Sequence, residues 1–389
     1  MQFTDEQYYA ISQLEKWYRK YNHQVIDISG LAASGVYEAV EEFIDKMEFD
    51  PREIVYLSYD QKQVLEMASK RLHAYYLPSI IYKYTRVVDF DSLPVINQSS
   101  SALRYHWEKD VRKKIDERYK LMVVFDSSLM NKETINDLCS FGIPIILMRD
   151  PALIPSPDTY TFLREPNIKI DELNPVLLRD PVKYFAIKAL KGDKIAPGAY
   201  DTVTVVPRKQ LNLYNLKSSE MVLTLSDELM NSMNTTYREN VMKLKTTNTA
   251  VNERLIVMND MYAHKLVNPD EKRLKIFLRK GMVCYVSKCN KHAAVTRYMP
   301  IELRPEFYGE SFTDLYLDRY YLNNIDVESR QAIPDEIVQA KYAYALSASM
   351  ARLSHWDKVT IVADMNDELS NRLLYNAITR CSRSLTLAI

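Results

Sequence analysis

Two of the seven glycines of this 389-residue sequence, Gly30 and Gly35, stand in a segment that could bind a phosphate group. The apolar run 24–28 leads into Gly30-Leu31-Ala32-Ala33-Ser34-Gly35, and apolar residues at helical spacing follow from Val36. A strand, a loop with two glycines and a helix can hold an anion through backbone N–H groups and the helix dipole. Such a loop also needs a lysine after the second glycine and then a serine or threonine, whereas this chain has Val36 and Tyr37. The segment predicts the backbone of a phosphate site without its charge, although taken alone it is more often only a tight connection.

The elements that would position this loop are short apolar strands alternating with helical patterns. A first helix is expected over 3–21, with Thr4 as its N-cap. Further strands are expected at 53–59, 121–126 and 143–150, with helices at 60–72 and 132–139. Because short buried strands alternate with helices, we expect an α/β fold whose parallel sheet is covered on both faces.

Seven further segments carry a resemblance to a known family. They are FTDEQYYAI from Phe3, LMVVFDSSLM, IILMRDPALIPSP, IDELNPVLLRDP, SDELMNSMNTTYR, YAYALSASMARLSHWDKVTIVAD and LLYNAITRCSRSL. In this order, and together with the loop, they resemble the motifs of superfamily 1 helicases, specifically the Dda-like and RecD-like 5′-to-3′ branch found in phages and bacteria. The resemblance spans nearly the whole chain.

The resemblance implies two RecA-like parallel-sheet domains, the fold of P-loop NTPases, with a small β-rich, SH3-like insertion in the second. The first domain is expected at 1–173, with a small insertion around 89–116. The second is expected at 174–242 and 336–389, with the inserted module at 243–335. A helix is expected over 336–348, followed by a strand at 358–364, a helix at 368–379 and a last strand.

Several positions keep the residue that the family uses. Gln7 matches the glutamine that reads adenine, Asp126 the aspartate that coordinates magnesium, and Arg380 the arginine finger. Each has a plainer alternative: an exposed helix residue, an acceptor of neighbouring N–H groups, and an arginine held by packing of its stem. The other retained positions are Asp150, Pro151 and Pro155 after the strand at 143–150, then Asn234, Arg238, Tyr344, Ala345, Trp356, Asp357 and Val359, and finally Tyr375, Ala377 and Thr379. The candidate nucleic-acid contacts are Asn234, Arg238, Arg352 and Trp356.

The positions that would touch a phosphate, the metal or the attacking water have changed. Ser127 stands where the general-base glutamate belongs, Leu153 where a glutamine senses the γ-phosphate, and Pro175 where an arginine contacts it. Phosphoryl transfer depends almost entirely on positioning and electrostatics, and losing one such group costs about 10² to 10³ in rate. Other replaced positions are Arg149 for glycine, and Ser349, Met350, Arg352, Leu353 and His355 for His, Lys, Gln, Gly and Glu.

We therefore expect a pseudo-ATPase, or pseudohelicase, with no catalytic residue and no required cofactor, and with affinity for ATP and magnesium weaker than millimolar. An active enzyme would need a lysine from elsewhere, such as Lys46 or Lys62, to reach the phosphates. The vestigial nucleotide site would comprise Gln7, Gly30, Ser34, Gly35, Val36, Tyr37, Asp126, Ser127, Asp150 and Arg380.

Composition excludes several classes of protein. With 51 basic and 51 acidic residues the chain has no net positive field, so nucleic-acid binding would need a local patch.

Four scattered cysteines favour a reducing compartment, and Cys284, Cys289 and His292 lack a fourth ligand, so we expect no zinc site. No apolar stretch approaches the length of a membrane span. We expect a cytoplasmic protein, in a bacterial host cell if phage-encoded.

Three functions remain open from the sequence. The first is a non-enzymatic accessory or scaffold of DNA replication or recombination that binds single-stranded DNA, a replication protein or both. The second is a decoy that inhibits a host factor by protein–protein interaction. The third is a divergent but active ATP-dependent 5′-to-3′ DNA helicase.

Overall fold

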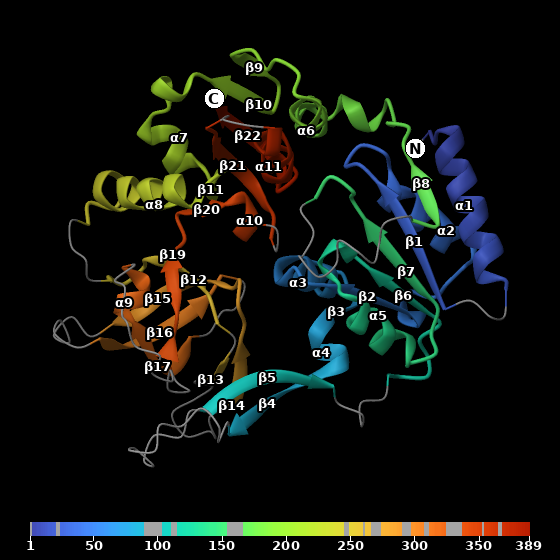
Figure 1. The fold of residues 1–389 in the computed structure, drawn as a ribbon, viewed down its shortest axis with the longest axis horizontal. Coiled ribbons are helices and arrows are strands. Elements are labelled where there is room, and N and C mark those ends of the chain that lie inside the picture. The colour runs from blue at the N-terminus through green and yellow to red at the C-terminus, as the bar shows by residue number, and fades with distance from the viewer. Residues whose placement is uncertain are drawn as a thin grey trace. The chain divides into compact units, whose positions relative to one another are not determined.

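The chain folds into two compact units (Figure 1). Unit 1 comprises Met1–Tyr82, Lys109–Met230 and Leu346–Ile389, and unit 2 comprises Lys83–Glu108 and Asn231–Ala345. The computed structural model describes residues 2–20, 24–88, 103–109, 115–153, 166–244, 249–259, 261–265, 274–289, 297–306, 311–323, 337–351, 354–364 and 368–389.

The first sheet of unit 1 is parallel throughout and has the order β3-β2-β6-β7-β1-β8. Strand β1, which feeds the loop, lies between β7 and β8, and β7 separates it from β6. This is the strand order of a RecA-like domain, and it brings the carboxyl ends of β1, β7 and β6 to one edge. The strands are β1 (Val25–Gly30), β2 (Ile54–Ser58), β3 (His73–Tyr76), β6 (Leu121–Val124), β7 (Ile145–Arg149) and β8 (Ile168–Ile170).

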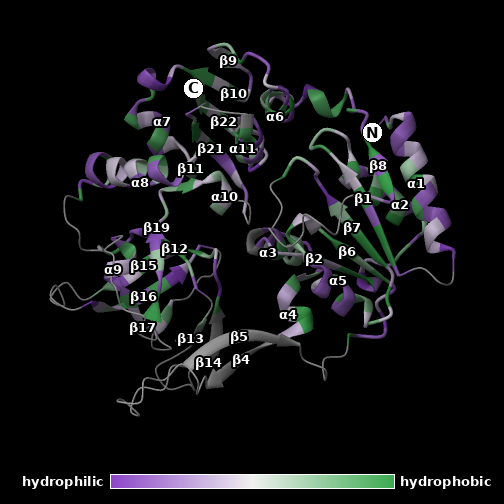
Figure 2. Cartoon of the chain, in the orientation of Figure 1, coloured by the Kyte–Doolittle hydropathy of each residue, from purple (hydrophilic) through white to green (hydrophobic). Residues whose placement is uncertain are grey.

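Alternate residues of these strands pack on opposite faces of the sheet. Ile26 and Ile28 belong to a core cluster with helices α1 and α2, whereas Leu57 and Leu147 belong to a second cluster with α4 and α5. Figure 2 shows the hydrophobic residues gathered in these strands. The helices are α1 (Asp5–Tyr18), α2 (Val36–Lys46), α3 (Gln61–Ser69), α4 (Leu77–Ile81) and α5 (Lys132–Cys139).

The second sheet of unit 1 has the order β20-β11-β21-β22-β10-β9. Parallel pairs join β11, β21, β22 and β10, and β9 adds to the edge in antiparallel direction. The fold is therefore α/β with two RecA-like parallel sheets, as the sequence predicts. The strands are β9 (Gly198–Tyr200), β10 (Val203–Val206), β11 (Met221–Thr224), β20 (Ala345–Ser347), β21 (Trp356–Val362) and β22 (Cys381–Ala388). The helices are α6 (Pro181–Lys191), α7 (Leu213–Ser218), α8 (Asp227–Thr236), α10 (Ala348–Ala351) and α11 (Glu368–Ile378).

Unit 2 is mainly β. One sheet follows the order β14-β13-β17-β16-β15-β12-β19, β18 pairs with β17, and β4 (Tyr82–Val88) and β5 (Leu103–Lys109) form a separate two-stranded sheet. The residue bounds expected for the two RecA-like domains and the inserted module stay a prediction. The other elements are β12 (Arg254–Val257), β13 (Met261–Lys265), β14 (Leu274–Leu278), β15 (Val283–Cys289), β16 (Tyr298–Pro305), β17 (Phe312–Asp318), α9 (Arg319–Leu322), β18 (Ile337–Val338) and β19 (Ala340–Tyr342).

The helix expected over 336–348 is wrong. The described part of this segment forms β18, β19 and β20, and α10 begins only at Ala348. Strand β19 pairs with β12, and Tyr342 and Tyr344 are buried in the core of unit 2. Sheet pairing and burial of two tyrosines thus override the local helical pattern.

A buried ion pair holds the core of unit 2 beside these tyrosines. Glu253 is fully buried, and its Oε1 lies 2.5 Å from Nε of Arg238. The guanidinium of Arg238 lies 4.1 Å from the centroid of the Tyr342 ring, and the N–H of Ala250 donates to Oε2 of Glu253 at 2.7 Å. Both charges are therefore enclosed by partners.

None of the described helices is long and apolar enough to cross a membrane.

We predict that Glu253→Ala lowers the free energy of unfolding by about 3–5 kcal/mol, because it leaves the guanidinium of Arg238 buried without its carboxylate. Glu302→Ala is the matched control, since Glu302 pairs with Lys288 at 3.2 Å on the surface and should cost less than about 1 kcal/mol. Denaturant unfolding of the two variants provides the comparison. Equal losses would contradict the role given to the buried pair.

Candidate functional site

The two-glycine loop is formed as the sequence predicts, and it is tightly closed. Gly35 precedes α2 with φ +78° and provides no side-chain cap, while a Cβ on Gly30 would lie 2.1 Å from Oγ of Ser34 and 2.8 Å from the carbonyl oxygen of Ile170. Both the N–H and the hydroxyl of Ser34 donate to the carbonyl of Leu31 at 2.8 Å. The two glycines are therefore required by the turn itself.

The side chain of Gln7 is hydrogen-bonded to this loop. It is fully buried, and its Nε2 donates to the carbonyl of Ser34 at 2.8 Å. Its Oε1 accepts at 2.8 Å from the N–H of Thr4, completing the predicted N-cap as a capping box, and at 2.8 Å from Nδ2 of Asn174. The N–H of Asn174 donates to the carbonyl of Ala33 at 2.9 Å. The side chain expected to read adenine thus bonds the start of α1, the loop and Asn174 to one another inside the protein.

A tyrosine from the second sheet bonds the loop on its other side. The N–H of Ala32 donates to the hydroxyl of Tyr375, on α11, at 2.8 Å, and that hydroxyl donates to Oδ2 of Asp150. Tyr375 is fully buried, and burial raises its pKa well above the usual value. A neutral hydroxyl therefore occupies a backbone donor of the loop.

The rest of α11 is fixed to the turn that follows Asp150. Arg372 donates to the carbonyls of Pro151, Ala152 and Leu153 at 2.9, 2.8 and 2.7 Å. Asn376 donates to the carbonyl of Ala152 at 3.1 Å. Side chains of α11 thus cap three successive carbonyl groups of the first sheet's edge, and Leu153, where the family has its γ-phosphate sensor, is buried beneath them.

The two retained aspartates lie at this edge. Burial raises the pKa of Asp150 to about 6, while the hydrogen bonds from Tyr375 and from the N–H of Ala152 oppose the shift. The charge of Asp126 raises this pKa further and that of Arg380 lowers it, so the three charges act on one another. Asp126 has φ +49° and accepts from the hydroxyl of Ser128, and Ser127 is fully buried.

Arg149 is balanced by an aspartate that the motif comparison did not identify. Its Nε lies 3.2 Å from Oδ2 of Asp27, on the neighbouring strand β1, and both side chains are nearly buried. Burial raises the pKa of Asp27 to about 6, and Arg149 opposes this shift. The only signal in the sequence is an acidic residue inside an otherwise apolar strand.

The other basic candidates contact the protein itself. Lys46 pairs with Glu15 at 3.7 Å, at the end of α2 away from the loop. Nη2 of Arg380 lies 3.3 Å from Oγ1 of Thr379. The side chain of Lys62 lies outside the described residues. Among the residues that the structure describes, no group of three His, Cys, Asp or Glu side chains could hold a metal ion.

Three of the four candidate nucleic-acid contacts are structural. Oδ1 of Asn234 accepts from the N–H groups of Tyr344 and Ala345 at 3.0 and 2.8 Å. Arg238 lies in the buried ion pair of unit 2, and Trp356 is 1% exposed at the start of β21. These three side chains lie in the interior of this structure, and their assignment to a DNA interface stays a prediction.

Other positions singled out from the sequence are outside the described residues. These are Arg352, Leu353, Pro155 and His292. The two cysteines near His292 are free thiols. Val36 is partly buried in the first sheet's core, and the Tyr37 ring lies 6.0 Å from that of Phe125, so both residues pack where the family has its charged and metal-binding pair.

Comparisons with known proteins give likeness in structure only. No protein-family model matches the sequence, and no curated protein sequence is significantly similar to it. A Pif1 helicase from Bacteroides, in complex with ADP-AlF3 and ssDNA, is 11% identical with a TM-score of 0.44, and the match covers 100% of this chain and 93% of that one. Pif1 helicase from Candida albicans is 11% identical with a TM-score of 0.39, covering 100% and 95%. Both likenesses are loose, and the RecA-like assignment rests on the strand order of the two sheets.

We predict that Gly35→Ala destabilises the protein by more than about 2 kcal/mol, because the left-handed backbone disfavours a Cβ and that atom would lie 1.8 Å from Nε2 of Gln7. Gly142→Ala is the matched control. Gly142 has φ +71° with no atom near its would-be Cβ, so only the backbone strain of about 1 kcal/mol remains. Thermal unfolding of both variants measures the difference, and equal losses would show that Gln7 does not confine the loop.

We predict that Asp150 makes the protein less stable as pH rises from about 4 to about 6. Its pKa is higher in the folded protein than the usual value of about 3.9, so the folded state binds the proton more tightly over this range. Asp150→Asn should therefore flatten the dependence of the free energy of unfolding on pH between 4.5 and 7. Denaturant titrations at several pH values measure it, and an unchanged profile would rule out this burial effect.

Proposed function

We propose that this chain is a helicase-like protein that does not hydrolyse ATP and acts by binding, as a non-enzymatic accessory or scaffold of DNA replication or recombination. The observation that carries the proposal is the hydrogen bond from the N–H of Ala32 to the hydroxyl of Tyr375. A phosphate at this loop would be held by backbone N–H donors, and this one already has an acceptor from the protein.

The residues around the loop support the same proposal. Val36 and Tyr37 offer neither a cation for the phosphates nor a ligand for magnesium, and Ser127 cannot serve as a general base. Arg149 adds a positive charge where the family has glycine, but Asp27 pairs with it. The donor set at this edge therefore does not fit magnesium-bound ATP.

The partner is proposed to be a replication protein, single-stranded DNA or both. Asn234, Arg238 and Trp356 are used internally. The segment 111–120 holds five Lys and Arg residues, and two of them, Arg118 and Lys120, pair with Asp116 and Glu53, each at 2.6 Å. These pairings reduce the local positive field that DNA binding needs, and they favour a protein partner. Exposed aromatic rings such as that of Tyr214, 77% exposed on α7, suit contact with either class.

A host-factor decoy is the second candidate. It is favoured by the same internal pairing of basic groups, because a decoy needs the shape of a helicase and no DNA-binding charge. Recovery of partners from the host cell separates the two, with a nuclease-resistant complex containing a replication protein supporting the accessory role. A complex with an unrelated host enzyme, whose activity falls on binding, would support the decoy.

We predict no ATP turnover above background, with or without single-stranded DNA. Asp126→Asn and Arg380→Ala should leave that background unchanged, because neither residue completes a catalytic site. A sensitive phosphate-release assay on the full chain checks this. DNA-stimulated turnover that Asp126→Asn abolishes would establish the divergent active helicase instead.

Binding to single-stranded DNA is tested by the fluorescence anisotropy of a labelled oligonucleotide at low and high salt. Binding that weakens steeply with salt would support single-stranded DNA as a partner. Absence of binding at low ionic strength would remove DNA and leave a protein partner.

A further inference from the structure

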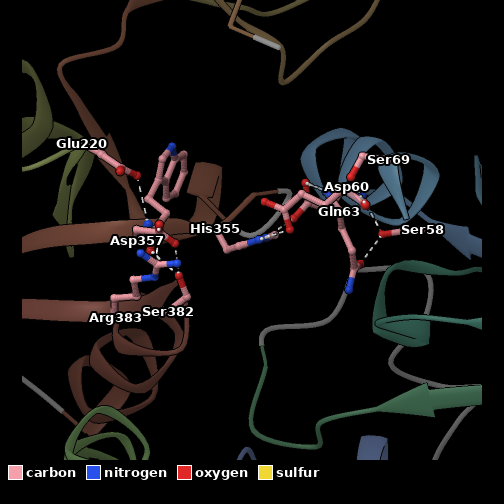
Figure 3. Close-up of polar contacts among 11 residues, drawn as sticks. Ser58, Asp60, Gln63, Ser69, Glu220, His355, Asp357, Ser382 and Arg383 are labelled. Atoms are coloured by element: carbon pink, nitrogen blue, oxygen red, sulfur yellow. Dashed lines mark hydrogen bonds and ion pairs between the residues drawn. The ribbon is translucent and has the colours of Figure 1, made fainter. Parts of the chain in front are cut away.

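His355 reaches from the start of β21 to α3 and lies between two carboxylates of the first sheet's domain. Its Nδ1 lies 2.9 Å from Oδ2 of Asp60, and its Nε2 lies 3.2 Å from Oε2 of Glu66. Figure 3 shows the imidazole pointing toward α3 and away from the cluster around Asp357. The histidine side chain is 26% exposed, so it exchanges protons with solvent.

The chemistry of imidazole makes this contact depend on protonation. Both ring nitrogens face a carboxylate oxygen, and only the imidazolium has two N–H groups to donate. In the neutral ring one nitrogen would turn its lone pair toward a carboxylate. The protonated ring therefore makes two charge-assisted hydrogen bonds, and the neutral ring makes one ordinary bond and one repulsive contact.

The carboxylate of Asp60 is held in place for this contact. Its Oδ1 accepts from the N–H of Gln63 at 3.2 Å, at the start of α3. Its own N–H donates to Oγ of Ser58 at 2.9 Å, and that hydroxyl donates to Oε1 of Gln63 at 2.8 Å. Because one oxygen caps the helix, the other is aimed at His355 (Figure 3).

Figure 3 also shows a cluster of charged groups around Asp357, and these groups bond to one another. The N–H of Asp357 donates to Oε2 of Glu220 at 3.0 Å. Oδ1 of Asp357 accepts from the hydroxyl of Ser382 at 2.6 Å, and Oδ2 lies 3.4 Å from Nε of Arg383. Asp60, directly before α3, and Glu66, on α3, are carboxylates that contact His355 from the first sheet's domain.

A second set of hydrogen bonds joins the same two domains and does not depend on the proton of His355. Arg372 keeps its charge throughout, and it donates to three backbone carbonyls. The pKa of Tyr375 is raised well above its usual value, so its hydroxyl remains a donor. Asp150 does titrate near pH 6, but both its forms can accept from Tyr375. Helix α11 therefore stays docked when His355 loses its proton.

We propose that His355 is a proton-controlled clasp between the two parallel-sheet domains. With the proton bound, it ties β21 to α3. When the proton is lost, β21 separates from α3, whereas α11 stays bonded to the first sheet's domain and serves as the hinge. The clasp does not rest on the proposed absence of ATP hydrolysis.

The test is a distance between the two domains, measured in the full chain by paired spin labels at pH 6 and pH 8.5. Labels at Tyr8→Cys on α1 and Tyr214→Cys on α7 occupy exposed positions, with Cys139→Ser and Cys289→Ser removing the partly exposed thiols. We expect the population at the short distance to fall about threefold from pH 6 to pH 8.5, the size expected of a partly exposed ion pair.

Three variants make the outcome specific. His355→Gln should show the lower population at both pH values, and His355→Lys, which keeps its charge, should show the higher one at both. His73→Gln is the matched control, because Nδ1 of His73 lies 2.8 Å from the hydroxyl of Tyr119 within the first sheet's domain, and it should keep the response. A wild-type distance that ignores pH, or a response that persists in His355→Gln, would overturn the clasp.

Discussion

One hydroxyl group, that of Tyr375, joins the two-glycine loop to the second sheet, and the contacts around the loop depend on this link. It accepts from the backbone of the two-glycine loop and donates to Asp150, and so it joins the ends of β1 and β7 to helix α11 of the second sheet. In nucleotide-dependent enzymes of this layout a bound phosphate can link such a loop to groups on the facing domain. In this chain the protein's own side chain makes the link. Tyr375 is fully buried in this arrangement, and burial raises the pKa of Asp150 to about 6 against the opposing effect of the hydrogen bond that Tyr375 donates.

Once the hydroxyl is in place, the other contacts of the edge complement it. Arg372 and Asn376 satisfy the carbonyls beside Asp150, and Gln7 and Asn174 satisfy those of the loop. Each polar group of the loop named above thus has a partner from the chain, which is what a largely buried turn requires. Charge is balanced in the same way at Arg149, because a nearly buried cation needs a neighbouring anion, and Asp27 provides it.

Much of the fold could be predicted from the sequence, and the contacts inside it could not. Alternating apolar runs gave the order of strands and helices because burial on both faces of a sheet leaves a strong periodic signal. The helix predicted over 336–348 is wrong because the pairing of β19 with β12 is a long-range contact that no local pattern encodes. Gln7, Asn234 and Arg238 match positions of a family motif, yet the direction of their side chains depends on partners far away in the sequence, such as Asn174, Tyr344 and Glu253.

The central claim is that the phosphate site is filled by the protein, and calorimetric titration of the full chain with magnesium and ATP tests it most directly. The account predicts no saturable binding below millimolar nucleotide, in the wild-type chain and in Asp126→Asn alike. A micromolar isotherm that Asp126→Asn abolishes would contradict it, since Tyr375 would then have to leave the loop when nucleotide binds.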